Sequence, residues 1–369
     1  MFKKIFFLLS FIFYLLTFPV FVGATADSSN FLPPKDEYYK AKILSIAELP
    51  AESNEFIGKT LKFEARILSG KEKGKTIGII YTQEAEKSWE TFKEKEKIIV
   101  SKTIIDGQIE YLLVEKYRLT PLLLVFGIFF SLAAIFGRRK GVLSLLGLGF
   151  SLLILNFYVV PKIADGGNAF GISFLGSLAI ATISLFLAHG INKRTAVAYL
   201  STVITLLVSA VLALLFVAAS KLWGAGSEEA INLQLSLTES INLRGLLLGG
   251  IIIGTLGVLD DVTTAQAAAV AELKEANSSL GFGELYRRGL SIGREHIASL
   301  VNTLVLAYAG ASLPLFMFFT IDKAQPLWVI FNSEFMAEEI VRTLVGSSAL
   351  ILAVPISTLL AAYYFAKKS

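Results

Sequence analysis

Apolar and polar residues fall into three successive patterns along this chain of 369 residues. An apolar run, Ile5–Val22, follows two lysines and ends in the small residues Ala24–Ala26. Residues 27–118 alternate between apolar and polar positions in short runs, whereas residues 119–369 carry long apolar segments separated by short polar loops. The three patterns predict an export signal, a β domain and a helical membrane domain.

Residues 1–26 have the order of a secretory signal peptide, with a basic start, an apolar centre and an A-x-A cleavage site before Asp27. An uncleaved first transmembrane helix is the alternative, because the apolar run is about long enough to span a bilayer. In both cases the lysines stay inside and residues 27–118 are exported. We therefore expect an extracytoplasmic domain over residues 27–118.

This exported region shows the period-two alternation of β-strands, for example over Lys62–Leu68 and Thr76–Tyr81. Hairpin-like breaks occur at Ser69–Gly74 and at Asp106–Gly107, while Thr82–Lys97 is polar and helix-prone. About five strands forming a small β-barrel fit this pattern, and an OB-like barrel is expected. A structural or sensory role and a specific ligand site remain equally open for this domain.

Seven apolar segments long enough to cross a bilayer follow the β domain and predict an α-helical polytopic membrane protein. The segments are Leu119–Phe136, Val142–Val160, Phe170–His189, Ala196–Ser220, Leu243–Leu259, Ile297–Thr320 and Ile340–Ala366. With the β domain outside, seven crossings place the C-terminus in the cytoplasm. The basic clusters support this orientation, since those of the membrane domain fall in the loops expected inside.

Composition agrees with a membrane protein, because 54% of the side chains are apolar and the mean hydropathy is +0.65. Residues 27–118 hold 16 Lys/Arg and 16 Asp/Glu, which is half of all formal charges. The net charge of +4 comes from short basic clusters rather than one stripe, so no nucleic-acid partner is implied. The absence of cysteine excludes disulfides, thiol nucleophiles and cysteine-based metal sites.

The main candidate site is the pair Asp260–Asp261, which directly follows a glycine-rich apolar run. Carboxylates are costly inside a bilayer, at about 2.5–3.5 kcal/mol each near its centre. On a helix, Thr263, Thr264 and Gln266 follow the pair and offer oxygen ligands for a proton or cation site. The alternative is that the span ends at Leu259 and that the pair caps a following cytoplasmic helix, Val262–Ala276, within a cytoplasmic amphipathic segment of residues 262–293.

A second polar set enters the next span and is expected to face the aspartate pair. Glu295, Ser299 and Asn302 are spaced as i, i+4 and i+7, which places them on one helix face. Arg294 and His296 are candidate relay partners in support of that stripe. For Arg294 and His296 an interfacial position is the favoured explanation, whereas Asn302 lies deeper in the span and is the stronger candidate.

The sequence does not contain the residue motifs expected of the common hydrolase and metalloenzyme classes. His189 and His296 are the only histidines, and neither stands in a metalloprotease or serine-hydrolase motif. With no cysteine, the ligands for a zinc site are too few. We therefore expect no enzymatic activity, no catalytic residues, no resident metal and no cofactor.

Several motifs of this chain resemble the YibE/F family of bacterial membrane proteins. They are Leu68–Lys75, Gly257–Gln266, Gly293–Ser299 and Asn302–Gly310. The resemblance implies a bacterial cell membrane location and supplies no substrate. A fainter similarity links the aspartate-bearing helix and the helix after it to proton-driven exporters of the RND type, by analogy alone.

Two functions follow as hypotheses. The first is a transporter or ion-coupled permease for an unknown small solute or ion, with Asp260 and Asp261 as the proton or cation site. The second is a membrane scaffold or sensor whose exported domain binds an envelope component or partner protein. The lipid bilayer is the one certain partner, and a homo-oligomer stays open.

Overall fold

The computed structural model describes residues 37–49, 57–84, 90–105, 108–236, 241–314, 317, 321 and 326–367. The chain divides into two compact units, one of them Gly23–Phe129 and the other mainly Phe130–Ser369. The signal peptide expected over residues 1–26 lies outside the described residues, so its cleavage stays a prediction.

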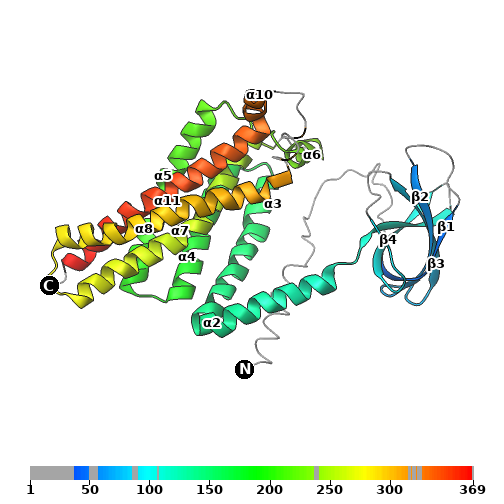
Figure 1. The fold of residues 1–369 in the computed structure, drawn as a ribbon, viewed down its shortest axis with the longest axis horizontal. Coiled ribbons are helices and arrows are strands. Elements are labelled where there is room, and N and C mark those ends of the chain that lie inside the picture. Colours follow the sequence, from blue (N-terminus) through cyan, green and yellow to red (C-terminus); the bar gives the residue numbers. More distant parts are fainter. Residues whose placement is uncertain are drawn as a thin grey trace. The chain divides into compact units, whose positions relative to one another are not determined.

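The first unit is a small β-barrel of five antiparallel-paired strands (Figure 1). The strands are β1 (Glu37–Leu49), β2 (Ile57–Ile67), β3 (Thr76–Glu84), β4 (Lys97–Ile105) and β5 (Gln108–Lys116). Their order in the sheet is β3-β2-β1-β4-β5, and the edge strands β3 and β5 approach each other, so that the barrel is nearly closed. The predicted barrel is confirmed, and this strand order agrees with the OB-like arrangement expected from the sequence.

Alternating residues of the strands fill the barrel, as the period-two pattern requires. In β1, Tyr39, Ala41 and Ile43 are buried, and in β2 the side chains of Phe63 and Ala65 are fully buried. The expected helical character of Thr82–Lys97 is absent from its described part, because β3 continues to Glu84 and residues 90–96 form no helix.

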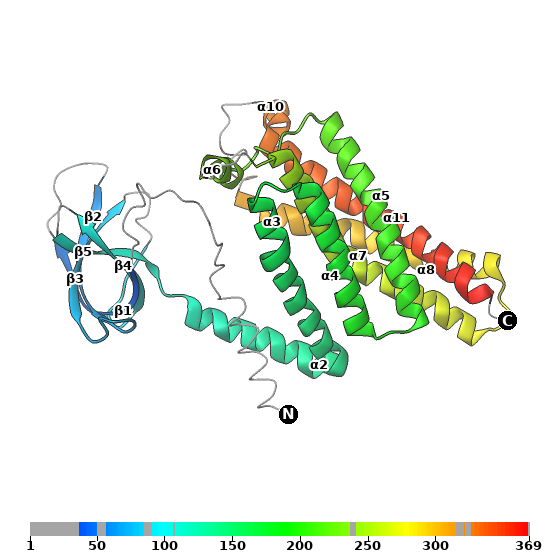
Figure 2. The same ribbon diagram turned by 180° about the vertical axis from the view of Figure 1, so that it is seen from behind.

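The second unit is helical (Figure 2). Its elements, together with the helix that leads into it, are α2 (Leu119–Ile154), the π-helical turn η2 (Leu155–Val159), α3 (Val160–Ala164), α4 (Ala169–His189), α5 (Lys193–Ala219), α6 (Glu228–Ser236), α7 (Leu243–Ala276), α8 (Phe282–Ala311), α10 (Leu327–Asn332) and α11 (Glu334–Ala366). Asparagine caps three of the long helices. The side-chain oxygens of Asn168, Asn192 and Asn242 each accept the backbone N–H three residues later, which fixes where α4, α5 and α7 begin.

Five helical stretches among the described residues are long and apolar enough to cross a membrane, so the expected count of seven is not confirmed. The first stretch, Leu119–Ala164, is 46 residues long and contains both of the first two expected spans. Arg138 breaks it with φ 49° and ψ −133°, which turns α2 sharply. The expected span from Ile297 is not among the five, because its described part belongs to α8, whose N-terminal half is rich in charged residues.

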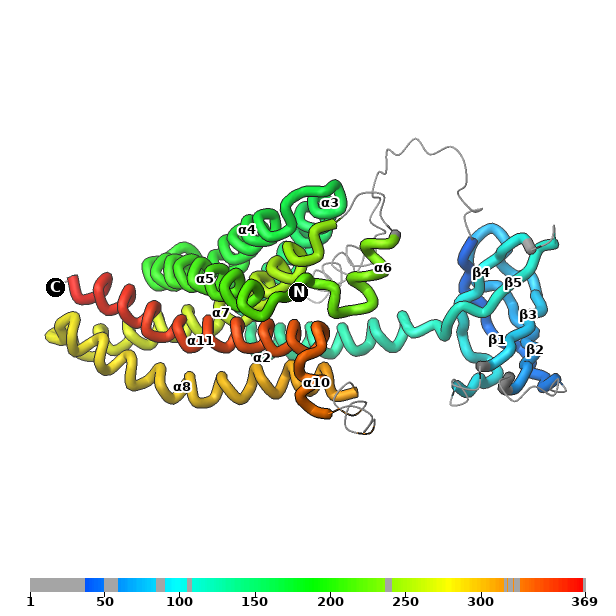
Figure 3. Tube along the Cα trace, turned by 90° about the horizontal axis from the view of Figure 1, so that it is seen from above, coloured from blue at the N-terminus to red at the C-terminus, as the bar shows by residue number. Residues whose placement is uncertain are grey.

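Helix α7 lies at the centre of the helical unit, packed against α4, α5 and α11. Helix α11 lies between α5 and α8 and contacts both, as well as α7 (Figure 3). The shared core includes Leu206 of α5, Leu256 and Leu259 of α7, and Ala353 of α11. The candidate residues of α7 therefore sit on one of the two most buried long helices among the described residues of this unit, the other being α11.

Candidate functional site

The aspartate pair lies inside an uninterrupted helix. Helix α7 runs from Leu243 to Ala276 without a break, and its N-cap is Asn242. The interpretation of the pair as the cap of a separate helix beginning near Val262 is therefore wrong. Hydropathy falls at the two aspartates, but no glycine or proline follows them before the end of α7, and Ala265–Ala276 consists mostly of good helix formers.

The position of Asp260 along α7 is interior. It is 16 residues from Arg244 and 12 residues from Glu272, the charged positions towards the two ends of the helix. At 1.5 Å per residue these separations are about 24 Å and about 18 Å along the axis. If Arg244 and Glu272 lie outside a hydrocarbon core about 30 Å thick, the core must fit into the length of helix between them. Asp260 is farther than about 12 Å from either end of that length, so it lies within the core in every such placement.

The two aspartates have different surroundings. Asp260 is partly exposed as a residue, but its Oδ1 atom is buried and has no hydrogen-bond partner among the described residues. Asp261 is exposed. Asp260 follows Gly249 by 11 residues, which is close to three helical turns, so both lie on the side of α7 that packs against Ser173 of α4.

The threonines after the pair do not surround its carboxylates. The Thr264 hydroxyl donates to the backbone carbonyl of Asp260 at 2.7 Å, as a threonine in a helix commonly does. Thr263 is fully buried, and its Oγ1 lies 2.7 Å from Oγ1 of Thr202 on α5. The structure therefore does not assemble the expected carboxylate–threonine ligand set.

Thr202 belongs to a row of buried hydroxyls that was not predicted from the sequence. Helix α5 buries Ser201, Thr202, Thr205 and Ser209 completely. The Ser209 hydroxyl lies 3.4 Å from Oγ1 of Thr255 on α7. Thr202 pairs with Thr263, after Asp260 in α7, and Ser209 pairs with Thr255, before it. The row therefore runs alongside the turn of α7 that carries Asp260.

Gln266 has a structural role that its side-chain contacts define. It is fully buried, and its Nε2 donates to the Gly289 carbonyl of α8 and to the Thr358 hydroxyl of α11, both at 2.7 Å. These two bonds tie three helices together. The Oε1 atom is buried and has no hydrogen-bond partner among the described residues.

The polar stripe of α8 does not meet the aspartate pair. Glu295, Ser299 and Asn302 are exposed, as are Arg294 and His296. The buried face of α8 is marked instead by Gly289 and Gly293, whose lack of a side chain lets α7 and α11 approach closely. Glu295 lies about 200° around the helix from Gly293, so it points away from that contact.

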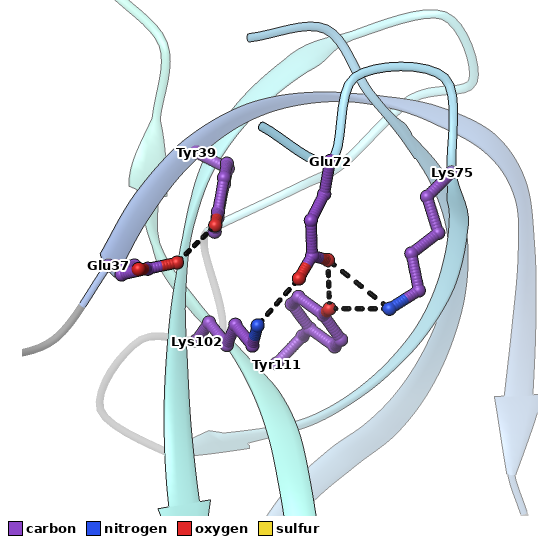
Figure 4. A network of polar contacts seen from close by, with 6 residues as sticks. All are labelled: Glu37, Tyr39, Glu72, Lys75, Lys102 and Tyr111. Atoms are coloured by element: carbon purple, nitrogen blue, oxygen red, sulfur yellow. Dashed lines mark hydrogen bonds and ion pairs between the residues drawn. The ribbon is translucent and has the colours of Figure 1, made fainter. Parts of the chain in front are cut away.

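The β-barrel carries a separate polar network around Glu72, which lies in the turn between β2 and β3 (Figure 4). Glu72 accepts hydrogen bonds from Lys102 of β4 at 2.5 Å, from Lys75 at 3.2 Å and from the Tyr111 hydroxyl of β5. Lys75 also donates to Tyr111 at 2.9 Å. The network joins the β2–β3 turn to β4 and β5, close to the edge where the barrel closes.

Hydrogen bonds from Lys102 and then Tyr111 lower the pKa of Glu72 to about 2, against an ordinary value of 4.5. The same contact with Glu72 raises the pKa of Lys102. Both groups are therefore charged over the whole physiological range, as suits a fixed structural contact. Within the part of the chain that the structure describes, no cluster of histidine and carboxylate side chains could hold a metal ion.

The fold and the candidate site define a multi-pass helical membrane protein with a small β-barrel before the first apolar helix that the structure describes. The family model for YibE/F-like proteins matches residues 125–367, which cover most of the helical unit. The chain belongs to the YibE/F-like family, as the motifs around Asp260 and Gly293 suggested. No curated protein and no solved structure shows significant similarity to it.

Proposed function

We propose that this protein is an ion-coupled membrane transporter in which Asp260 carries the coupling proton or cation. The observation that carries the proposal is the buried, unpartnered Oδ1 of Asp260 in the interior of an uninterrupted apolar helix. A carboxylate in that position is costly unless a proton or cation neutralises it. Such residues commonly belong to ion or proton pathways.

The buried hydroxyl row supports a polar route beside this carboxylate. Its members can each donate and accept, so a row of them suits a bound proton, cation or water chain better than an apolar contact would. Thr205 lies between the two paired hydroxyls of α5, and its Oγ1 has no partner among the described residues. A further polar atom is therefore available at about the level of Asp260.

The different surroundings of the two aspartates assign them different roles. Asp260 has the enclosed oxygen and is the proposed ion carrier. Asp261 is exposed, and we expect it to influence Asp260 through its negative charge rather than to bind the ion. Asp261→Asn is therefore the matched control for Asp260→Asn, with the same chemistry at the neighbouring position.

Charge displacement on a solid-supported membrane tests the proposal without knowledge of the solute. Proteoliposomes holding the purified protein are subjected to a rapid jump in pH, Na⁺ or K⁺. The wild-type protein should give a transient current for at least one of these ions, Asp260→Asn should lose it, and Asp261→Asn should retain it. Absence of a current for all three ions in the wild type, or equal currents in wild type and Asp260→Asn, contradicts the proposal.

A further inference from the structure

A basic pocket lies at the end of the helical unit where α4 joins α5. It has a volume of about 920 Å³ and lies between this junction, the middle and end of α7, and the end of α11. Its charged lining consists of Lys140, Lys193, Arg194, Lys274 and Glu275, with His189 beside them. Four cationic side chains against one carboxylate give the pocket a positive field.

Two of these cations have no acidic neighbour to neutralise them. Arg194 forms ion pairs with Glu272, at 2.6 Å, and with Glu275, so its charge is largely balanced. Among the residues that the structure describes, no carboxylate lies within ion-pair distance of Lys140 or Lys193. Lys274 adds a further positive charge, but its ammonium group is held by the backbone carbonyls of Ser278 at 2.6 Å and Leu280 at 3.0 Å. Lys140 and Lys193 are therefore the two cations of the pocket for which the described residues provide no such anchoring contact.

The first turn of α5 adds a second source of positive potential. Asn192, Lys193, Arg194 and Thr195 all line the pocket, so the N-terminal end of a helix of 27 residues faces it. Backbone N–H groups at a helix start lack intrahelical acceptors, and the helix dipole is positive there. Phosphate groups bind at helix starts of this kind, particularly when lysine or arginine side chains are close by.

One side of the pocket is apolar, which points to an amphipathic ligand. Ile191 is 93% exposed in the α4–α5 turn, and Phe365 and three alanines complete the apolar lining. An exposed isoleucine next to lysine side chains can contact the glycerol and acyl part of a lipid while the lysines contact its headgroup. Basic pockets between transmembrane helices bind anionic lipid headgroups in this way.

We propose that this pocket binds the phosphate group of an anionic phospholipid, held by Lys140, Lys193 and the start of α5. A soluble phosphate ester carries the same recognised group and is the competing source. The proposal does not depend on transport, since the pocket would bind its ligand equally in a sensor or scaffold.

Native mass spectrometry of the purified full-length protein, titrated with phosphatidylglycerol or phosphatidylcholine, tests the proposal. Wild type should bind phosphatidylglycerol in preference. Lys140→Gln/Lys193→Gln should weaken this binding by roughly 30-fold, because each lysine near an anionic lipid contributes a factor of about five. The matched control is Lys162→Gln/Lys221→Gln, which removes the same charge away from the pocket and should leave binding unchanged.

Two further variants separate lost binding from lost folding. Lys140→Arg/Lys193→Arg keeps both charges and should retain binding. Glu275→Gln removes the one carboxylate of the pocket, frees Arg194 from one ion pair and should strengthen binding. Equal affinity in wild type and the double glutamine variant, or weaker binding in Glu275→Gln, overturns the proposal.

A competition arm distinguishes the two sources of phosphate. Glycerol 3-phosphate at millimolar concentration should not displace phosphatidylglycerol if the apolar lining contributes to binding. Retention of the lipid under these conditions supports a lipid site. Displacement of the lipid, combined with lysine-dependent binding of glycerol 3-phosphate alone, overturns the lipid assignment in favour of a soluble phosphate ester.

Discussion

Replacing Gly293 by alanine should destabilise the helical unit, because no space exists for the added methyl group. A Cβ at Gly293 would lie 2.2 Å from Cγ1 of Val354 on α11 and 3.1 Å from Nε2 of Gln266 on α7. Ordinary contacts of a Cβ atom begin near 3.4 Å. Helix α8 must therefore retreat by about 1 Å, or Val354 and Gln266 must move.

The expected loss of stability is the sum of three terms, two unfavourable and one favourable. Overpacking a close helix contact costs about 1–3 kcal/mol. Moving α8 also weakens the bond from Gln266 to the Gly289 carbonyl, 2.7 Å long, which contributes about 1 kcal/mol. Alanine offsets part of this loss, since it favours a helix over glycine by about 1 kcal/mol. The net loss should be about 1–3 kcal/mol, or about 2–4 °C in Tm for each kcal/mol.

Thermal unfolding of the purified protein in detergent measures this loss. Gly310→Ala is the matched control on the same helix, because nothing lies within 4 Å of its added Cβ, and its Tm should be unchanged or slightly raised. Val354→Ala should rescue Gly293→Ala, so the double variant should be more stable than the sum of the single effects predicts. A wild-type Tm for Gly293→Ala, or strict additivity with Val354→Ala, refutes the packing argument.

Three further predictions concern the barrel, the hydroxyl row and the topology. Glu72→Gln should lower the urea midpoint of the barrel. Because the folded pKa of Glu72 is lowered to about 2, the wild-type advantage should be present above the ordinary pKa of 4.5 and should be lost as the pH falls through 2. An advantage of the same size on both sides of this range contradicts the account. Thr202→Val should lower the free energy of unfolding by about 1 kcal/mol, because it leaves the Thr263 hydroxyl without its partner. The double variant Thr202→Val/Thr263→Val should lose less than twice this amount, since neither hydroxyl then remains. Additive losses in thermal unfolding would contradict a hydrogen bond between the two threonines. Gly281→Cys, in a chain with no native cysteine, should resist an impermeant thiol reagent on whole cells, and rapid labelling reverses the expected orientation.

The β-barrel and most of the apolar helices could be predicted from the sequence because their patterns are strong and local. In strands such as Lys62–Ile67 of β2 apolar and polar residues alternate, and apolar runs of spanning length are typical of membrane helices. The number of crossings was less predictable. Hydropathy detects apolar length, whereas the break in α2 depends on the backbone conformation of Arg138, which no hydropathy pattern encodes.

The candidate site was predicted in part. The sequence draws attention to Asp260 as a carboxylate beside an apolar run, but hydropathy alone places it at the end of a span, since transfer cost does not report whether a helix continues. The spacing of the polar residues from Glu295 to Asn302 predicts one helix face, but spacing alone does not determine whether that face packs against α7. Close packing at Gly289 and Gly293 determines the inner face of α8 instead.

The hydroxyl row of α5 could not have been predicted as a site from local pattern alone. Serine and threonine in an apolar helix usually bond to a carbonyl one turn earlier, as Ser201 does to Val197 at 2.8 Å. Their burial against α7 depends on which face of α5 the neighbouring helices cover. The spacing of Ser201, Thr205 and Ser209 at successive turns is the signal that could have indicated a continuous polar edge.

Labelling with dicyclohexylcarbodiimide shows whether Asp260 takes up a proton inside the helical unit. This apolar reagent reacts with protonated carboxyl groups in apolar surroundings, and mass spectrometry of the digested protein locates the adduct. We expect an adduct on Asp260 in the wild type and in Asp261→Asn, with slower labelling as the pH is raised or as a competing cation binds. An Asp260 that stays unmodified at every pH tested, or an adduct on Asp261 alone, would contradict the assignment of Asp260 as the ion carrier.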